Sequence, residues 1–182
     1  MGAGTTGCSN NETIAAAYHG RVSSPEPLDD LEMSAWRSLL HAHASVIRRL
    51  ENELVAEHGL SLPAYEVLAH LSEQVDRSQR MTELSEAALL SPSGVTRLVD
   101  KLQRDGLVVR RRCQADARVI YCELTDAGMA RLVAAYPTHL RGVREHLVDK
   151  LDRADLHSMA ASMAKLVDPT ACDETLPESA AS

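Results

Sequence analysis

The sequence predicts a mostly helical protein that carries one small β-hairpin. The 182-residue chain has no Phe, one Trp and four Tyr, whereas sheets usually draw on aromatic and β-branched residues. Its Leu, Val, Ala and Met recur at helical spacing, which is typical of helices with one buried face. Residues 107–112 and 118–124 have the pattern of two strands joined by a loop short enough for a hairpin. The length suits one domain with a core of ordinary size.

The first predicted helix spans residues 28–58 and ends at Gly59, because glycine commonly terminates helices. Its apolar seam is spaced alternately by four and three residues and consists of Trp36, Leu40, His43, Ile47, Leu50 and Leu54. Such spacing is typical of a helix that packs lengthwise against another helix.

The chain divides by composition into an arm, a folded part and a tail. Residues 1–27 and 169–182 are rich in small and polar residues and are expected to be disordered. The folded part covers residues 28–168. Its central segment, residues 61–124, is flanked by three helices that we expect at residues 28–58, 126–150 and 153–167. Their apolar stripes exceed what one small domain can cover, so we expect them to form a homodimer.

The central segment contains two further helices in close succession. One is predicted to begin at Thr82, a suitable N-cap, and the next at Ser91, followed by Pro92 in the first helical position. In the second of these helices the apolar residues fall on one face, and the opposite face is polar. The polar face consists of Ser93, Thr96, Arg97, Asp100 and Lys101.

Charge is unevenly distributed along the chain. The net charge is −7, yet residues 91–118 hold seven Lys or Arg against three Asp or Glu, a local charge of +4. A polar helix face with hydroxyls and a guanidinium suits the major groove of duplex DNA. Ser93, Thr96 and Arg97 are the candidates for base contacts. Lys101 and the helix start at Thr82 suit contacts to DNA phosphates. Ser91, the cap of the helix that carries the candidates for base contacts, is also a candidate DNA contact.

The predicted hairpin is strongly basic. Arg110, Arg111 and Arg112 are consecutive in its first strand, and Arg118 follows an acidic turn. An arginine at a hairpin tip can enter a narrow minor groove, where the negative potential is strongest. Asp116 is expected to cap the turn or to pair with an arginine, which would hold Arg118 in position. The sequence therefore favours double-stranded DNA as a partner.

These motifs resemble the MarR family of winged helix-turn-helix transcriptional regulators. The resemblance covers about residues 30–167 and is most specific in Ser-Pro-Ser-Gly-Val-Thr-Arg-Leu-Val-Asp-Lys-Leu, Asp116-x-Arg118 and Leu124-Thr125-x-x-Gly128. It implies an obligate homodimer that binds a pseudo-palindromic operator and represses transcription until a small ligand or an oxidant acts on it. It also implies that the helix after Ser91 reads the major groove and that Arg118 enters the minor groove.

The effector is the most open question in the sequence. A small aromatic or phenolic ligand would lie between the flanking helices that we expect to form the dimer and the central segment, residues 61–124. The candidate residues that border such a pocket are Trp36, Arg37, His41, Tyr65 and Glu66. Ordinary packing is an alternative explanation for each of them, since Trp and Tyr are frequent where helices meet.

Oxidation and metal binding are the other effector types. Cys113 and Cys122 lie in the hairpin, where neighbouring arginines would lower a thiol pKa. Spectator thiols are the better explanation of both, since nothing supplies a resolving partner. His41 and His43 diverge on a helix, and no His pair has the i, i+4 spacing of a zinc site. We expect no metal and no cofactor.

Other protein classes are less well supported. A winged helix that binds proteins instead of DNA is the main alternative, and it would not need Arg118 at the hairpin tip. No nucleophile–base pairing, phosphate loop or metal cluster indicates an enzyme. No apolar run is long enough to span a bilayer, and no signal peptide is recognisable, so we expect a cytoplasmic protein without a membrane partner.

Overall fold

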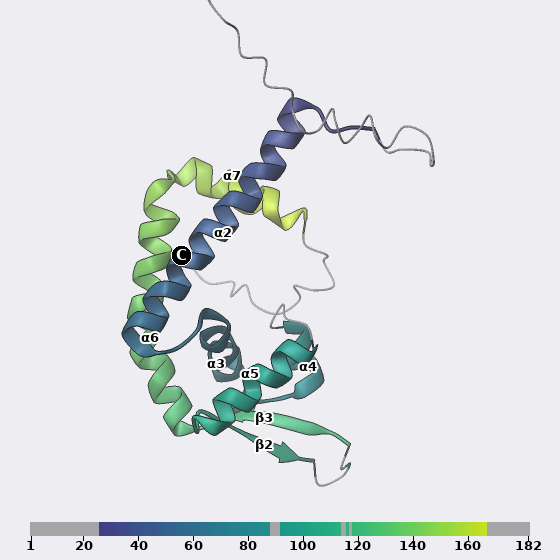
Figure 1. Cartoon of the computed structure of the whole chain (residues 1–182), viewed down its shortest axis with the longest axis vertical. Helices are drawn as coiled ribbons and strands as arrows, with labels where there is room; N and C mark the ends of the chain where they lie inside the picture. The colour runs from purple at the N-terminus through teal and green to yellow at the C-terminus, as the bar shows by residue number, and fades with distance from the viewer. Residues whose placement is uncertain (1–25, 88–91, 114–115, 117, 167–182) are drawn as a thin grey trace, which may run out of the picture. The chain divides into compact units, whose positions relative to one another are not determined.

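A computed structural model of the chain describes residues 26–87, 92–113, 116 and 118–166. The predictions made for the arm and tail fall almost entirely outside these residues, as does the one for Ser91. The described part is mostly helical with one small antiparallel sheet (Figure 1), which confirms the predicted fold class. Its elements in chain order are α2 (Asp30–His58), α3 (Leu62–Glu73), η1 (Val75–Arg77), β1 (Ser78–Arg80), α4 (Met81–Ala87), α5 (Pro92–Arg104), β2 (Val108–Arg112), β3 (Ile120–Leu124), α6 (Asp126–His146), η2 (Val148–Lys150) and α7 (Arg153–Ala164).

The chain forms two compact units that meet within α2, one up to Ala44 and one from Ser45 onward. In the first unit the start of α2 is stabilised by a reciprocal pair of hydrogen bonds. The Glu32 amide donates to Asp29 Oδ1 and the Asp29 amide donates to Glu32 Oε2, both at 2.8 Å. This capping box satisfies two backbone donors and places two carboxylates at the positive end of the helix dipole.

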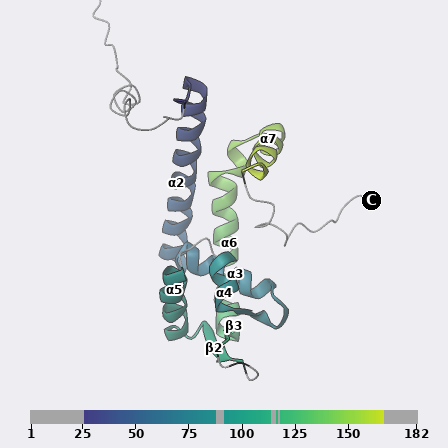
Figure 2. The same ribbon diagram turned by 90° about the vertical axis from the view of Figure 1, so that its right-hand side faces the viewer.

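The second unit holds the hydrophobic core. α3, α4 and α5 pack with the sheet, and α6 lies alongside α3 (Figures 1 and 2). The largest fully buried side chains are Leu54, Leu68, Leu71, Leu84, Leu102, Val67, Val95, Val99, Val108 and Cys122. Leucine and valine thus build the core, as the composition predicted.

The sheet has three strands, not two. Its order is β1-β3-β2, so β3 is central and pairs with both neighbours in antiparallel fashion. β1 is only three residues long and reads Ser-Gln-Arg, without the apolar alternation from which strands are recognised. The prediction of a two-stranded hairpin therefore missed it.

Two predicted helix boundaries were wrong. α4 begins at Met81 rather than after a Thr82 cap, because β1 leads directly into the helix and Glu83 Oε2 accepts a hydrogen bond from the Arg80 amide at 3.4 Å. The helix predicted for residues 126–150 is shorter than expected, because α6 ends at His146 and a 3₁₀ turn follows.

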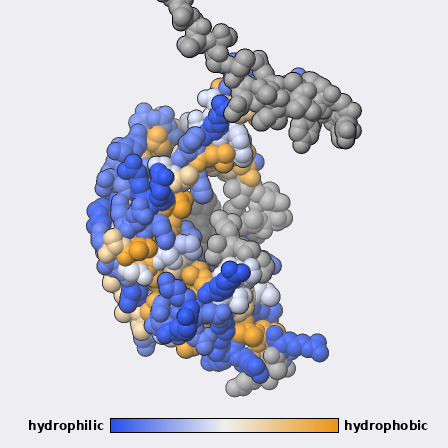
Figure 3. All heavy atoms as spheres, in the orientation of Figure 1, coloured by the Kyte–Doolittle hydropathy of each residue, from blue (hydrophilic) through white to orange (hydrophobic). Residues whose placement is uncertain are grey.

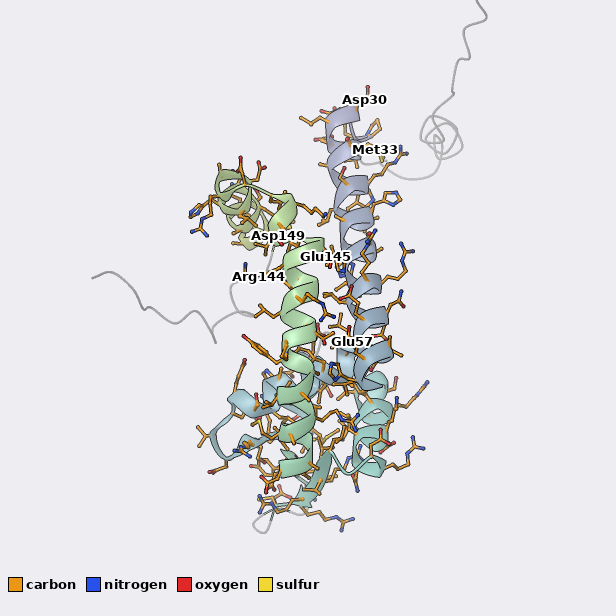
Figure 4. The ribbon with its side chains drawn as sticks, turned by 90° about the vertical axis from the view of Figure 1, so that its left-hand side faces the viewer. Asp30, Met33, Glu57, Arg144, Glu145 and Asp149 are labelled. Carbon is orange, nitrogen blue, oxygen red and sulfur yellow. The ribbon has the colours of Figure 1, made fainter. Side chains whose placement is uncertain are left out.

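α6 is joined to the second half of α2 by buried and half-buried polar contacts. Thr138, only 4% exposed, donates to Glu57 Oε2 at 2.7 Å and lies 2.9 Å from His58 Nε2. The Thr138 hydrogen bond and the Arg141 guanidinium hold the pKa of Glu57 below its ordinary value. Glu57 accordingly lies on the side of α2 that faces α6 (Figure 4).

The start of α6 is fixed to the end of α5 and the start of β2. The Leu107 carbonyl oxygen accepts a hydrogen bond from the Thr125 amide at 3.1 Å, and the single Thr125 hydroxyl hydrogen is shared between the carbonyl oxygens of Gly106 at 2.8 Å and Leu107 at 3.0 Å. Thr125 Oγ1 in turn accepts from the Gly128 amide at 3.0 Å, which makes Thr125 the N-cap of α6. A Cβ on Gly128 would lie 2.1 Å from the Leu107 carbonyl oxygen, so only glycine allows this close approach.

We predict that Gly128→Ala lowers the free energy of unfolding by about 2 kcal/mol, since the clash is with backbone and overpacking costs ~1–3 kcal/mol. Gly142→Ala is the matched control. There the added methyl would meet the flexible ends of Leu50 and Glu53, at 2.7 and 2.8 Å, which can move aside. Denaturant unfolding of both variants at one protein concentration tests this, and equal losses of stability would contradict it.

Candidate nucleic-acid interface

α5 has the two faces that its sequence predicted. Val95, Val99 and Leu102 are buried and fix the helix on the core. Ser93, Thr96, Arg97, Asp100 and Lys101 are all exposed on the opposite side. The helix ends before Gly106, whose φ of +72° is the left-handed conformation that glycine adopts at helix ends. A docked helix with a polar outer face is what major-groove reading requires.

Arg110 links the hairpin to α5. Its Nη1 donates to Asp100 Oδ1 at 2.5 Å and to Gln103 Oε1 at 3.2 Å, and its Nη2 donates to the Thr96 carbonyl oxygen at 3.2 Å. These acceptors lie along one side of α5, so a single guanidinium holds the helix at a fixed distance from β2. The positive charge of Arg110, which we predicted to contact DNA, is therefore largely compensated by the Asp100 carboxylate.

The turn between β2 and β3 is held by its own backbone and by Asp116. The Cys113 amide donates to the Val119 carbonyl at 2.9 Å, and the Val119 amide donates to the Asp116 carbonyl at 3.0 Å. Asp116 Oδ1 accepts from the Arg118 amide at 2.9 Å. Of the two roles considered for Asp116, the described residues thus show the turn contact and not an ion pair with an arginine.

The basic residues of this surface differ in how far their charge is already compensated. Arg110 pairs with Asp100 and Arg111 with Glu123. Within the described ranges, no acidic partner lies at ion-pair distance from Arg97, Lys101, Arg112 or Arg118, and all four are exposed. Hydrophilic side chains project from the end of this unit that carries α5 and the hairpin (Figure 3). An uncompensated positive surface attracts phosphate groups.

The remaining predicted contacts have less definite surroundings. Thr82 is exposed in the first turn of α4. Ser93 and Thr96 both have interaction partners within this protein.

The comparison with known proteins identifies the family. The model of the MarR family matches residues 58–119. The uncharacterized HTH-type transcriptional regulator YkoM of Bacillus subtilis is 30% identical over 76% of this chain and 95% of its own length. The crystal structure of Sco3205, a MarR family transcriptional regulator from Streptomyces coelicolor, in complex with DNA, is 30% identical with a TM-score of 0.75, over 80% of this chain and 91% of that one. The chain belongs to the MarR family.

One further relative in Bacillus subtilis carries a more specific name. The HTH-type transcriptional repressor YetL is 38% identical to this MarR family chain over 46% of the chain and 50% of its own length.

A cavity of about 610 Å³ lies between α3 and α6 of this MarR family chain. Tyr65 and Glu66, two of the predicted effector residues, border it, and Arg37 and His41 line a separate depression in the first unit. Trp36, in that unit, is 52% exposed. The remaining lining residues were not predicted for this role: Val67, Ala69, His70, Glu73, Leu84, Tyr136, His139, Leu140 and Val143. The i, i+3 spacing of Tyr136 and His139 in α6 was the available signal.

Burial changes the titration of three groups around the cavity. The Tyr65 and His139 rings are stacked, with centroids 4.3 Å apart. Burial raises the pKa of Tyr65 and of Glu66 and lowers the pKa of His139. Each shift favours the uncharged form, as desolvation requires. His139 Nδ1 is buried without a hydrogen-bond partner in the described structure.

The two hairpin cysteines differ in their surroundings. Cys122 is fully buried in β3, and burial raises its pKa to about 11 although Arg110 lowers it. The expectation that nearby arginines would lower the pKa of both thiols is therefore wrong for Cys122, because desolvation outweighs the charge. Cys113 is half-buried.

The described residues form neither a metal-ligand cluster nor a membrane-spanning helix. No group of three or more His, Cys, Asp or Glu side chains there is placed to hold a metal ion. None of the helices described is both long and apolar enough to cross a membrane.

We predict that iodoacetamide at pH 8 modifies Cys113 in the folded chain and leaves Cys122 unmodified, because a pKa of about 11 keeps Cys122 as the unreactive thiol. Peptide mass spectrometry distinguishes the two sites. Denatured chain serves as the control in which both react, and native labelling of Cys122 at the denatured rate would refute the assignment.

Proposed function

We propose that this MarR family chain is a homodimeric, sequence-specific regulator that binds double-stranded DNA in the cytoplasm. We further propose that it represses transcription from a pseudo-palindromic operator until a small aromatic ligand binds. The observation that carries the proposal is the exposed set Arg97, Lys101, Arg112 and Arg118, which lies on α5 and the hairpin and has no compensating acid among the described residues. Enzymatic activity has no place in this proposal.

The geometry supports different DNA contacts for α5 and for the hairpin. α5 would enter the major groove, with Ser93, Thr96 and Arg97 at base edges and Lys101 on phosphates. The hairpin is the wing, and Arg118 at its turn would enter the adjacent minor groove. Thr82, Ser91, Arg111 and Arg112 would supply further backbone contacts. The DNA complex of the Streptomyces coelicolor relative supports this use of the fold.

Exposed apolar side chains support the dimer. Trp36, Leu40 and Ile47 of α2 expose 52%, 47% and 37% of their surface in the single chain, although they belong to the apolar seam. Met163 of α7 and Leu166, two residues beyond the end of α7, are also exposed. Side chains of this kind on helices at both ends of the folded part are typical of an interface that a second copy covers.

Repression and its relief rest on two different supports. The repressor role follows the name of the relative YetL. The proposal of a ligand response is supported by the cavity between α3 and α6, whose volume of about 610 Å³ lies within the range of small-molecule sites. A response through cysteine oxidation is less well supported, because Cys122 is buried with a raised pKa.

The test of DNA binding is fluorescence anisotropy of a labelled duplex from the gene's upstream region, titrated with dimer across a salt series. Wild type should bind tightly and lose affinity steeply with salt, as counterion release demands. Arg118→Ala should bind at least about tenfold more weakly, since a contact worth roughly 1.4 kcal/mol is lost, and should remain a dimer.

Arg144→Ala is the matched control for charge removal. Arg144 is exposed on α6, away from the wing (Figure 4), and its variant should bind the duplex like wild type. Arg118→Ala that binds like wild type would refute the role of Arg118. Wild-type binding equal on scrambled duplex, or absent, would favour a winged helix that binds proteins.

The dimer has its own test. Leu40→Glu places a charge in the exposed apolar seam of α2, so sedimentation velocity should show a shift from dimer to monomer, because burying an unpaired carboxylate is costly. Ser38→Glu, on the same helix outside the seam, should stay dimeric. A dimeric Leu40→Glu protein would exclude this part of α2 from the interface.

A further inference from the structure

The described lining of the cavity between α3 and α6 contains acidic side chains and no Lys or Arg, although an aromatic or phenolic ligand was expected there. Two carboxylates, Glu66 and Glu73, line it from α3. Among the described lining residues there is no Lys and no Arg. An anionic ligand would meet two like charges and no compensating cation, which is unfavourable in a partly desolvated site.

The other walls are aromatic and aliphatic. Tyr136, 54% exposed, and the stacked pair of Tyr65 and His139 provide rings. Leu84, Leu140 and Val143 provide apolar surface. Aromatic rings beside carboxylates attract organic cations, because the negative face of the ring and the carboxylate act together. The same walls disfavour a bare metal ion, and no trio of metal-ligating side chains occurs in the described part of the chain.

The polar groups of the cavity agree with a positively charged occupant. Glu66 is exposed and has no hydrogen-bond or ion-pair partner among the described residues. Partial desolvation raises its pKa, so an approaching cation would stabilise its charged form. His139 adds no competing positive charge, because burial lowers its pKa. His70 Nε2 lies 2.7 Å from Gln79 Oε1, so this nitrogen is already engaged.

We propose that this cavity binds a small organic cation with an aromatic body, its charge beside Glu66 and its rings against Tyr136. The proposal rests on the proposed function for its regulatory consequence, since only a DNA-binding repressor would be released by the ligand. The binding itself can be measured without DNA, which separates the two.

The probe is tetraphenylphosphonium, a permanent aromatic cation, and its control is tetraphenylborate, an anion of nearly the same shape. Calorimetric titration of the full chain in sodium buffer should show saturable binding of the cation and at least about tenfold weaker binding of the anion. Anion binding equal to or tighter than cation binding, or no binding of either probe, would overturn the proposal.

Variants locate the charge. Glu66→Gln should weaken cation binding at least about tenfold while preserving the circular dichroism melt. Glu86→Gln, an exposed glutamate of α4 outside the cavity lining, should bind like wild type. Tyr136→Phe should retain binding and Tyr136→Ala should lose it. A Glu66→Gln variant with unchanged affinity would refute the site. A cation that binds in this manner without changing the anisotropy of bound operator would leave the site intact and refute its regulatory role alone.

Discussion

The position of α5 and the hairpin relative to α6 depends on contacts to the carbonyl oxygen of Leu107. This oxygen accepts the amide of Thr125 and shares the Thr125 hydroxyl with the Gly106 carbonyl, and Gly128 packs directly against it. Three elements meet there, because α5 has just ended, β2 is about to begin and α6 starts with the Thr125 cap. A backbone oxygen that accepts hydrogen bonds and has no room around it fixes the direction of β2 relative to the start of α6, because hydrogen bonds are directional and close packing leaves no slack. The Leu-Thr-x-x-Gly sequence is therefore a structural requirement of the junction.

The basic residues of this surface have two different uses. Of the six cations predicted to contact DNA, Arg110 and Arg111 are paired with acids of the domain itself. Both pairs lie next to exposed cations that have no such partner in the described structure. One part of the basic sequence thus shapes the surface and another part is available to a ligand, although the chain as a whole is acidic.

Much of this was predictable because the deciding interactions are local. The faces of α5 followed from the 3.6-residue period, and the end of α2 followed from Gly59, whose φ is positive. β1 was not predictable, because a three-residue polar strand is defined only by its pairing with β3. The role of Arg110 could have been suspected from alternation, since it lies two residues after the buried Val108 and so on the same side of β2. The cavity depends on α3 and α6, about 70 residues apart in sequence, and only the fold brings them together.

The hydrogen bonds by which Arg110 joins β2 to α5 have a consequence for the DNA sites that the chain could bind. Because one guanidinium spans Thr96, Asp100 and Gln103, the helix and the wing form a single stiff body. On DNA, this rigid body would keep one distance constant within each half-site: the distance along the duplex between the bases read by α5 and the groove entered by the wing tip. An inserted base pair between the bases read by α5 and the groove entered by the wing tip would then abolish one of the two contacts.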